Sequence, residues 1–450
     1  MCTSSAARTT QLTNLCAFRQ AVYDHALTAR RDAQFDLLDA VLTAGPTHSL
    51  AEISQAPAFR RSWSSLYAAL EDGRQDEAWL RAYLVGHLPQ QGVVLLGGDA
   101  TAWPRRRART LPDQQYVHSP TPAVLAESVV VGQPYALLAW LAEPGTAWAL
   151  PLDLTRIPSS STASAVAAAQ VTRLNALRAA DDAAFWIYAF DGGYGNVAFW
   201  QALPQGDRFG VVSRLRKDRV LYREPGPYGG RGRPAKHGDR FAFKDATTWG
   251  VPTATQRLTD AHWGEVDLRY WANVHDKEDA GQPLGVLRAA VHGERATPPA
   301  ALWLSWHGPV REVEEIWRAY GARWSVEPSI RVRKEALHWT QPAVQTVAAM
   351  GIWTVLVSVG VWMLWLARGV VADRRWPWQR PQPGAKTPGR VQAGLGPLLR
   401  EIGTPARGVK GRGKAPGWPT GRVRQRPARH AVVKKTPPRA RAPAKRKKAA

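Results

Sequence analysis

The sequence predicts a mixed α/β fold, in which a mixed sheet flanked by helices is interrupted by a β-rich insertion. Short apolar runs with strand character alternate with helical runs over residues 90–216. Further strand-like runs, separated by Gly and Pro, fill residues 217–305. A helical subdomain is expected before this region and a disordered basic tail after it. Apolar residues make up 45% of the chain, which is enough for a sizeable core.

Residues 1–85 are expected to form the helical subdomain. The runs "LCAFRQAVYDHAL" and "RRDAQFDLLDAVLTAG" place apolar residues at the three-to-four spacing of an amphipathic helix. "SWSSLYAALEDG" then ends in Asp-Gly, which is a helix stop signal. A packing scaffold and a DNA-binding unit both agree with this pattern.

The first part of the core, residues 90–216, has the expected order β-β-β-α-β-α-β. Three strands, in "GVVLLGGDATAW", "SVVVGQPYALLAWL" and "TAWALPLDL", are predicted to form a meander. The Ala-rich run "STASAVAAAQVTRLNALRAA" is predicted to be a crossover helix that leads to the strand "AFWIYAF". "YGNVAFWQAL" is expected to be a short helix before a fifth strand, "RFGVVSRLR".

The insertion, residues 217–305, begins with the Gly/Pro/basic loop "REPGPYGGRGRPAKHGDR" and continues with strand-like runs that end at "AALWLSWHG". Residues 306–372 are expected to complete the core, with a helix that opens near Val310. An uncharged stretch follows, because residues 336–367 contain no Asp, Glu, Lys or Arg. This stretch is long enough to cross a bilayer, and the alternative is a buried core helix.

The remaining residues, 373–450, form the predicted basic low-complexity tail. From Arg374 to Ala450 there are 22 Lys and Arg residues and one acid, which leaves 38 basic and 35 acidic residues in the rest of the chain. The tail is therefore the main source of the net charge of +24. Such a segment is typical of a disordered region that contacts a polyanion such as nucleic acid, and the plainer alternative is a solubilising tail.

The cysteine content favours a reducing compartment. Cys2 and Cys16 are the two cysteines of the chain, and they form neither a CxxC pair nor a disulfide framework. The N-terminus lacks the charged region, apolar stretch and cleavage site of a signal peptide. We therefore expect a cytoplasmic protein.

Two carboxylates follow apolar strands and are candidates for chemistry. Asp99 comes after "GVVLLGG", and Asp191 follows "FWIYAF" and precedes two glycines that leave space around the carboxylate. A lone Asp at a strand end is more often a cap or turn residue. Together with a Glu on a nearby helix, however, two such residues could hold hard cations such as Mg²⁺, which prefer oxygen ligands.

The helical run "RAYGARWSVEPSIRVRKEALHW" supplies that Glu. Tyr320, Arg323, Glu327 and Lys334 lie at offsets of 0, 3, 7 and 14, which places them within an arc of about 60° on an α-helix. This arrangement suits a helix along a phosphate backbone, although a solvated charged face is the simpler interpretation of the spacing alone. Pro328 is expected to disturb the helix within this arc.

These residues resemble the Y-(2)-R-(3)-E-(6)-K signature of bacterial insertion-sequence DDE transposases. The segments "GGDATAW" and "YAFDGGYGN" are similar to those around the first and second Asp of that family, and the resemblance extends over about residues 90–372. It implies an RNase H-like fold and metal-dependent DNA cleavage and strand transfer at terminal inverted repeats. It also implies two Mg²⁺ or Mn²⁺ ions and a nucleoid-associated homodimer acting on paired DNA ends and target DNA.

By the same resemblance, Asp99, Asp191 and Glu327 would be the catalytic metal ligands. Tyr320, Arg323 and Lys334 would contact DNA phosphates, and a Trp of the insertion would stack on a base; the candidates are Trp249, Trp263 and Trp271. The uncharged stretch would then be a core helix, with no stable membrane association. Two alternatives remain: a non-catalytic DNA-binding relative, and a membrane protein with one span near residues 344–367 and a basic cytoplasmic tail.

Overall fold

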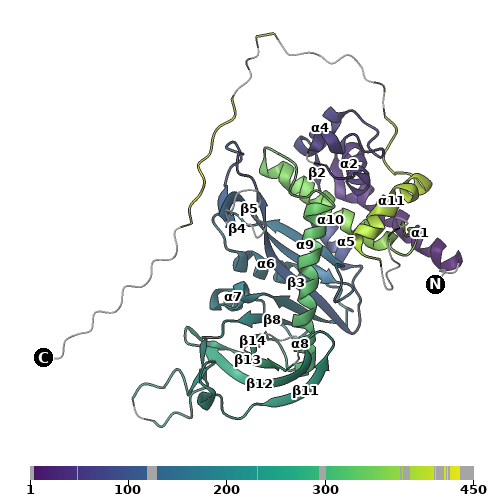
Figure 1. The fold of residues 1–450 in the computed structure, drawn as a ribbon. Helices are drawn as coiled ribbons and strands as arrows, with labels where there is room; N and C mark the ends of the chain where they lie inside the picture. The colour runs from purple at the N-terminus through teal and green to yellow at the C-terminus, as the bar shows by residue number, and fades with distance from the viewer. Residues whose placement is uncertain are drawn as a thin grey trace.

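The computed structural model describes most of the chain. The described residues are 5–47, 49–118, 129–230, 232–292, 301–374, 378, 386–409, 411, 420–421, 423 and 426–435. A helical part lies at one end of the molecule, a large sheet crosses the middle, and the strands of the insertion lie at the other end (Figure 1). The mixed α/β class and the large mixed sheet are confirmed.

The centre of the sheet is an antiparallel meander to which parallel strands are added. β3 (Val93–Pro104), β5 (Val129–Leu141) and β6 (Ala149–Arg156) form the meander. Helix α6 (Ala163–Ala176) then crosses to β7 (Phe185–Phe190), which pairs in parallel with β3. The short α7 (Val197–Ala202) leads to β8 (Phe209–Leu215), parallel to β7. The spatial order β6-β5-β3-β7-β8 agrees with the predicted meander and crossover.

The insertion extends this sheet instead of forming a separate layer. Its last strand, β14 (Leu302–His307), pairs antiparallel with β8, and the sheet continues through β13, β12, β9 and β10. Together the strands from β3 to β14 form one 12-stranded sheet. Its remaining members are β9 (Val220–Arg223), β10 (Arg240–Ala242), β11 (Ala254–Asp260), β12 (Gly264–Asp276), β13 (Asp279–Val291) and a short edge strand, β4 (Gln115–His118), which was not predicted from the sequence.

The single helix expected from Val310 onward is two helices. α8 (Val313–Ala322) ends in a 3₁₀ turn at Arg323–Ser325, and α9 (Val326–Glu335) begins directly after it. Pro328 is the third residue of α9, within the first turn, where a backbone N–H has no partner inside the helix. The chain therefore passes from α-helix to a 3₁₀ turn before Pro328, and the proline fits into the first turn of α9 without a kink inside that helix.

The uncharged stretch forms helix α10 (Val347–Ala367), which is the core helix of the protein. It is long and apolar enough to cross a bilayer, but 78% of its most apolar window is buried inside the protein. It packs between β6 and the N-terminal helices α1 (Ser5–Ala21) and α2 (Arg31–Thr43). The structure thus agrees with the core-helix alternative.

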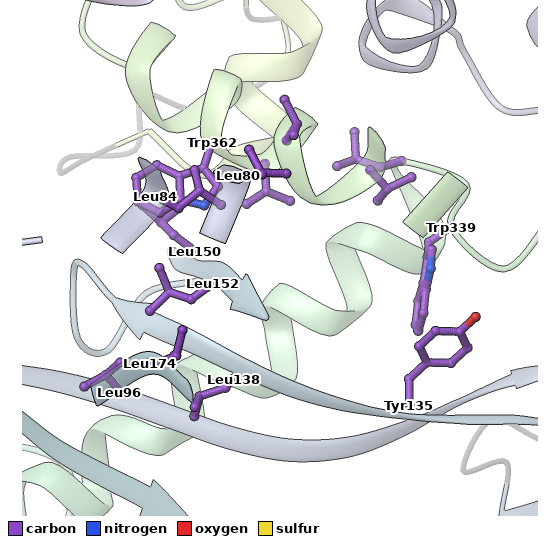
Figure 2. Close-up of a cluster of buried hydrophobic side chains, with 14 of the residues drawn as sticks. Leu80, Leu84, Leu96, Tyr135, Leu138, Leu150, Leu152, Leu174, Trp339 and Trp362 are labelled. Atoms are coloured by element: carbon purple, nitrogen blue, oxygen red, sulfur yellow. The ribbon is translucent and has the colours of Figure 1, made fainter. Parts of the chain in front are cut away.

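The core around α10 explains part of the high Trp content. Trp362 lies beside Leu80, Leu84 and Leu150 (Figure 2), and its indole N–H donates to the carbonyl of Pro151 at 2.8 Å. The indole of Trp339 packs edge-on against Tyr135 and donates to Thr354 at 2.9 Å. Both indole N–H groups have a hydrogen-bond partner inside the core, as is usual for buried Trp, so these rings are structural.

The helical subdomain is completed by a segment that was expected to belong to the tail. Helix α11 (Pro388–Ile402) packs against α2 and α10, so the prediction of a disordered tail is wrong for this segment. Val391, Leu395 and Leu398 are buried there and give the helix an apolar face that the basic composition concealed. The other elements of the subdomain are α3 (Leu50–Ile53), α4 (Trp63–Glu71), α5 (Glu77–Val85), a π-turn at Val22–Ala26 and the ribbon of β1 (Leu27–Ala29) and β2 (Arg74–Gln75).

Candidate active site

Asp99 lies in the middle of β3, where two glycines allow other elements to approach the strand closely. A Cβ on Gly97 would lie 2.5 Å from Val326 Cγ2, and a Cβ on Gly98 would lie 2.0 Å from the ring of Phe190. Val326 precedes Glu327 and Phe190 precedes Asp191. The expectation that the strand ends at Asp99 is therefore wrong, because β3 continues to Pro104. The glycines of "GGD" instead admit the two segments that carry the other acids.

Asp191 follows directly after β7, which is the parallel neighbour of β3. Its carboxylate accepts a hydrogen bond from the backbone N–H of Gly193 at 2.9 Å, which closes a turn after the strand. Asp191 and Asp99 thus come from adjacent strands of the central sheet, and the turn at Gly193 fixes the direction of the Asp191 side chain.

Glu327 reaches the same site from the first turn of α9, and Arg323 links it to Asp99. Arg323 Nη2 lies 3.0 Å from Glu327 Oε1, and Arg323 Nη1 lies 3.7 Å from Asp99 Oδ2. The Arg323 side chain is 14% exposed and that of Asp99 is 20% exposed, while that of Glu327 is 53% exposed. The guanidinium therefore lies between a nearly buried carboxylate and an accessible one.

The charge of Asp99 is disfavoured where it stands. Burial raises the pKa of Asp99 to about 6; Arg323 opposes this rise, while the negative charges of Asp191 and Glu327 add to it. The same Arg323 has a raised pKa, because Asp99, Tyr320 and Glu327 outweigh the effect of its own burial. The negative charges of Asp191 and Glu327 therefore act on Asp99, and the three acids together carry an excess of negative charge. A bound cation would offset this excess and favour the ionised form of Asp99.

The site is not a ready-made metal cage. Over the part of the chain that the structure describes, no three His, Cys, Asp or Glu side chains are arranged as metal ligands. The convergence of the three carboxylates on metal ions stays a prediction, and in this structure Arg323 lies between Asp99 and Glu327. The donor set nevertheless fits a hard divalent cation, since it consists of three carboxylates against the single positive charge of Arg323.

The other basic residue of the signature lies on the same helix. Lys334 is half-buried, and burial lowers its pKa, with Arg333 lowering it further and Asp99 opposing. Arg333 itself is buried, and burial lowers its pKa to about 9. Tyr320 is half-buried at the edge of the cluster that includes Ile316 and Trp317.

The three candidate tryptophans of the insertion differ in exposure. Trp271 is 1% exposed and packs against Trp249, Trp303 and Phe241, so no face of its ring is open to a base. The prediction is therefore wrong for Trp271 as it stands in this structure. Trp249 and Trp263 are half-buried and remain candidates.

Tyr194 is a residue of this site that sequence reasoning missed. Its side chain is 3% exposed, its ring packs 4.8 Å from that of Phe190, and its hydroxyl has no hydrogen-bond partner among the described residues. Burial raises the pKa of Tyr194 beyond the usual range, and the charges of Asp99 and Asp191 raise it further. The tyrosine in "DGGYG" was the available signal.

The three acids lie outside the cavity of the helical part. This cavity, about 740 Å³, lies between α2, α11 and the end of α9, and none of the three acids lines it. The accessible Glu327 lies beside the less exposed Arg323 and Asp99, so a large polyanionic substrate could approach the site from the side of Glu327. The mixed α/β fold with its large mixed sheet is consistent with the class of nuclease-like proteins.

Comparison with protein families identifies this class more closely. A family model described as DDE superfamily endonuclease matches residues 22–272, more than half of the chain, and the protein belongs to this family. The match includes Asp99 and Asp191 and ends before Glu327. Comparison with curated proteins gives no match.

Proposed function

We propose that this protein is a DDE transposase of an insertion sequence, which cleaves DNA at terminal inverted repeats and transfers the cut strand to target DNA. The main supporting observation is that Arg323 contacts both Asp99 and Glu327, while Asp191 follows the strand next to Asp99. The strand order β6-β5-β3-β7-β8 supports an RNase H-like assignment of the core. Membership of the endonuclease family supports DNA as the substrate.

Asp99, Asp191 and Glu327 are the residues that would hold two Mg²⁺ or Mn²⁺ ions. Such ions stabilise the attacking and leaving oxygens of an in-line phosphoryl displacement. The protein contributes position and charge: β3 and β7 fix two carboxylates, and α9 brings the third. The coupling of Asp99 to both other acids supports this assignment.

Arg323, Tyr320 and Lys334 would hold the DNA backbone beside these acids. A guanidinium forms short, charge-assisted hydrogen bonds to phosphate oxygens. A DNA phosphate can therefore replace Glu327 as the ion-pair partner of Arg323. Glu327 is then free to act as a ligand. Lys334 is half-buried on the same helix and would supply a second positive charge to the bound phosphate.

Two other interpretations are less well supported. A non-catalytic DNA-binding relative would not need to keep all three acids coupled in one place. A membrane protein would expose α10 to lipid, whereas α10 is largely buried. Recovery of the protein in a carbonate-resistant membrane pellet would favour the membrane alternative. We expect the protein to act in the cytoplasm, as a homodimer on paired DNA ends.

The test is cleavage of DNA that carries the ends of the element, in Mg²⁺, by the wild type and by Asp99→Ala, Asp191→Ala and Glu327→Ala. Each variant should lower the rate by more than about 100-fold, because each removes a group that stabilises charge in the transition state. Circular dichroism provides the control for folding. Cleavage by all three variants at the wild-type rate would exclude the assigned site.

A further inference from the structure

The C-terminal strap, which we define as residues 426–435, lies along the edge of the central sheet. The backbone N–H of Val433 donates to the carbonyl of Gln114 at 2.7 Å, and that of His430 donates to the carbonyl of Arg109 at 2.9 Å. Val433 also forms a parallel bridge with Gln115, the first residue of β4. The strap therefore adds main-chain bonds to an edge strand that would otherwise be open.

The strap brings basic side chains to a basic segment of the body. Arg106, Arg107 and Arg109 follow β3, and Arg429 of the strap joins them around a hollow that Thr340 and Gln341 also line. We call Arg106, Arg107, Arg109 and Arg429 the arginine cluster. All four side chains are exposed. The acid in this segment, Asp113, is paired with Arg156 at 2.6 Å and does not neutralise the cluster.

The arginine cluster is continuous with the candidate active site along two routes. β3 leads from Asp99 directly to Arg105, which donates to the carbonyls of Pro342 and Val344. α9 leads from Glu327 to the segment that contains Thr340, and this segment lines the same hollow. Each of these two chain segments therefore connects one of the acids to residues that line the hollow of the arginine cluster.

We propose that the arginine cluster binds the phosphate backbone of the DNA duplex that occupies the active site, on the flank of the cleaved phosphate. The inference rests on the proposed function for the identity of the substrate. Exposed guanidinium groups at a hollow lined by hydroxyl and amide groups are suited to phosphate oxygens and carry no base specificity. In this arrangement the strap contributes Arg429 to the DNA-binding surface.

The geometry also gives the place on the DNA where the cluster binds. Arg105 lies six residues beyond Asp99 along extended chain, which corresponds to about 20 Å at the rise of a β-strand. B-DNA advances about 3.4 Å per base pair, so for a duplex that runs along β3 the cluster lies about six base pairs from the phosphate at Asp99. DNA that is truncated closer to the cleavage site should therefore not reach the cluster.

The experiment measures binding of the full-length protein to an end duplex in EDTA, which separates binding from cleavage. The triple variant Arg106→Gln, Arg107→Gln and Arg429→Gln should lower the slope of log affinity against log salt by about 0.9 for each phosphate that is no longer neutralised. Hydroxyl-radical footprinting should show weaker protection about six base pairs from the cleavage site. An unchanged slope and footprint would overturn the proposal.

A second triple variant, Lys244→Gln, Lys277→Gln and Arg400→Gln, removes the same charge from exposed positions elsewhere. It should leave the footprint unchanged, and an equal effect of both triples would mean that only net charge matters and would overturn the proposal. Val433→Pro removes one of the two main-chain N–H groups that hold the strap. It should lower the slope as much as the single variant Arg429→Gln, measured beside it. Equal competition by an RNA duplex of the same length would point to RNA and would also overturn it.

The outcomes separate this inference from the proposed function. Asp99→Asn is assayed for cleavage in Mg²⁺, whereas the cluster variants are assayed for binding in EDTA. If Asp99→Asn still cleaved DNA, the proposed function would fail while the binding result stood. If the cluster variant kept its footprint while Asp99→Asn no longer cleaved DNA, the inference alone would fail.

Discussion

Arg323 Nη1 lies 3.7 Å from Asp99 Oδ2, so the arginine of the helix junction neutralises the carboxylate of the central strand. The opposite end of the same guanidinium holds Glu327. The 3₁₀ turn at Arg323–Ser325 makes this possible, because it places Arg323 at the joint between α8 and α9. In the absence of DNA, Arg323 therefore serves as the counter-ion of the acidic site.

Replacement of this counter-ion should change the response to metal. Arg323→Gln should lower the stability of the metal-free protein at pH 7 by about 1–3 kcal/mol, since a largely buried carboxylate loses its charged partner. Mn²⁺ should then raise the unfolding temperature of the variant by more than that of the wild type. Differential scanning calorimetry in EDTA and in Mn²⁺ measures both effects. An equal Mn²⁺ shift in the two proteins would show that Arg323 does not compete with the ion.

The raised pKa of Asp99 predicts a pH dependence of stability. In the folded state the pKa of Asp99 is about 6, whereas the usual pKa of this carboxyl group is 3.8. The folded protein thus binds more protons between these values, so the contribution of Asp99 to stability falls as pH rises through this window, by about 3 kcal/mol in total.

Asp99→Asn should remove this decrease and make the metal-free protein more stable than the wild type at pH 7 but not at pH 4. Urea unfolding at the two pH values measures the difference. A variant that is less stable than the wild type at pH 7 would contradict this prediction, because it would show that the fold stabilises the ionised carboxylate.

The glycines before Asp99 provide a test of positioning. Gly97→Ala forces its Cβ against Val326 and should cost about 1–3 kcal/mol of stability. Because α9 must move outward with Glu327, DNA cleavage should fall by about 100-fold. Gly351→Ala in α10 is the control: its Cβ enters open space, so stability should rise by about 0.5–1 kcal/mol with cleavage unchanged. Cleavage at the wild-type rate by Gly97→Ala would show that the position of Glu327 does not depend on the packing of Val326 against β3.

The buried hydroxyl of Tyr194 predicts an unusual gain in stability. Tyr194→Phe removes a polar group that has no partner among the described residues, so the free energy of unfolding should rise by about 1 kcal/mol. Chemical denaturation of the metal-free protein is the measurement. A clear decrease in stability would mean that the hydroxyl forms a hydrogen bond in solution.

The central strands and their acids could be predicted because their signals are local. An apolar run that ends in Asp99 or Asp191 identifies a strand and a candidate ligand from a few neighbouring residues. The chain order of strands and helices also limits the topology strongly. The continuation of the sheet from β8 to β14 could not be predicted, since it joins strands about 90 residues apart that carry no pairing signal.

The features that the sequence did not predict also depend on contacts between distant segments. The helix at Tyr320 has the periodicity of one continuous helix, and the 3₁₀ turn at its centre depends on packing against β3. Helix α11 was hidden by the basic composition around it, although Leu395 and Leu398 pack on its buried side. The pairing of Arg323 with Asp99 also could not be predicted, because side-chain contacts between distant segments leave no pattern in the sequence.

The central claim is that Asp99, Asp191 and Glu327 hold the metal ions that support DNA cleavage. The most direct measurement is anomalous diffraction from crystals of the protein with end DNA and Mn²⁺. We predict Mn²⁺ bound to the carboxylates of Asp99 and Asp191, with Glu327 released from Arg323. Anomalous density away from these carboxylates, at a Mn²⁺ concentration that supports cleavage, would contradict it.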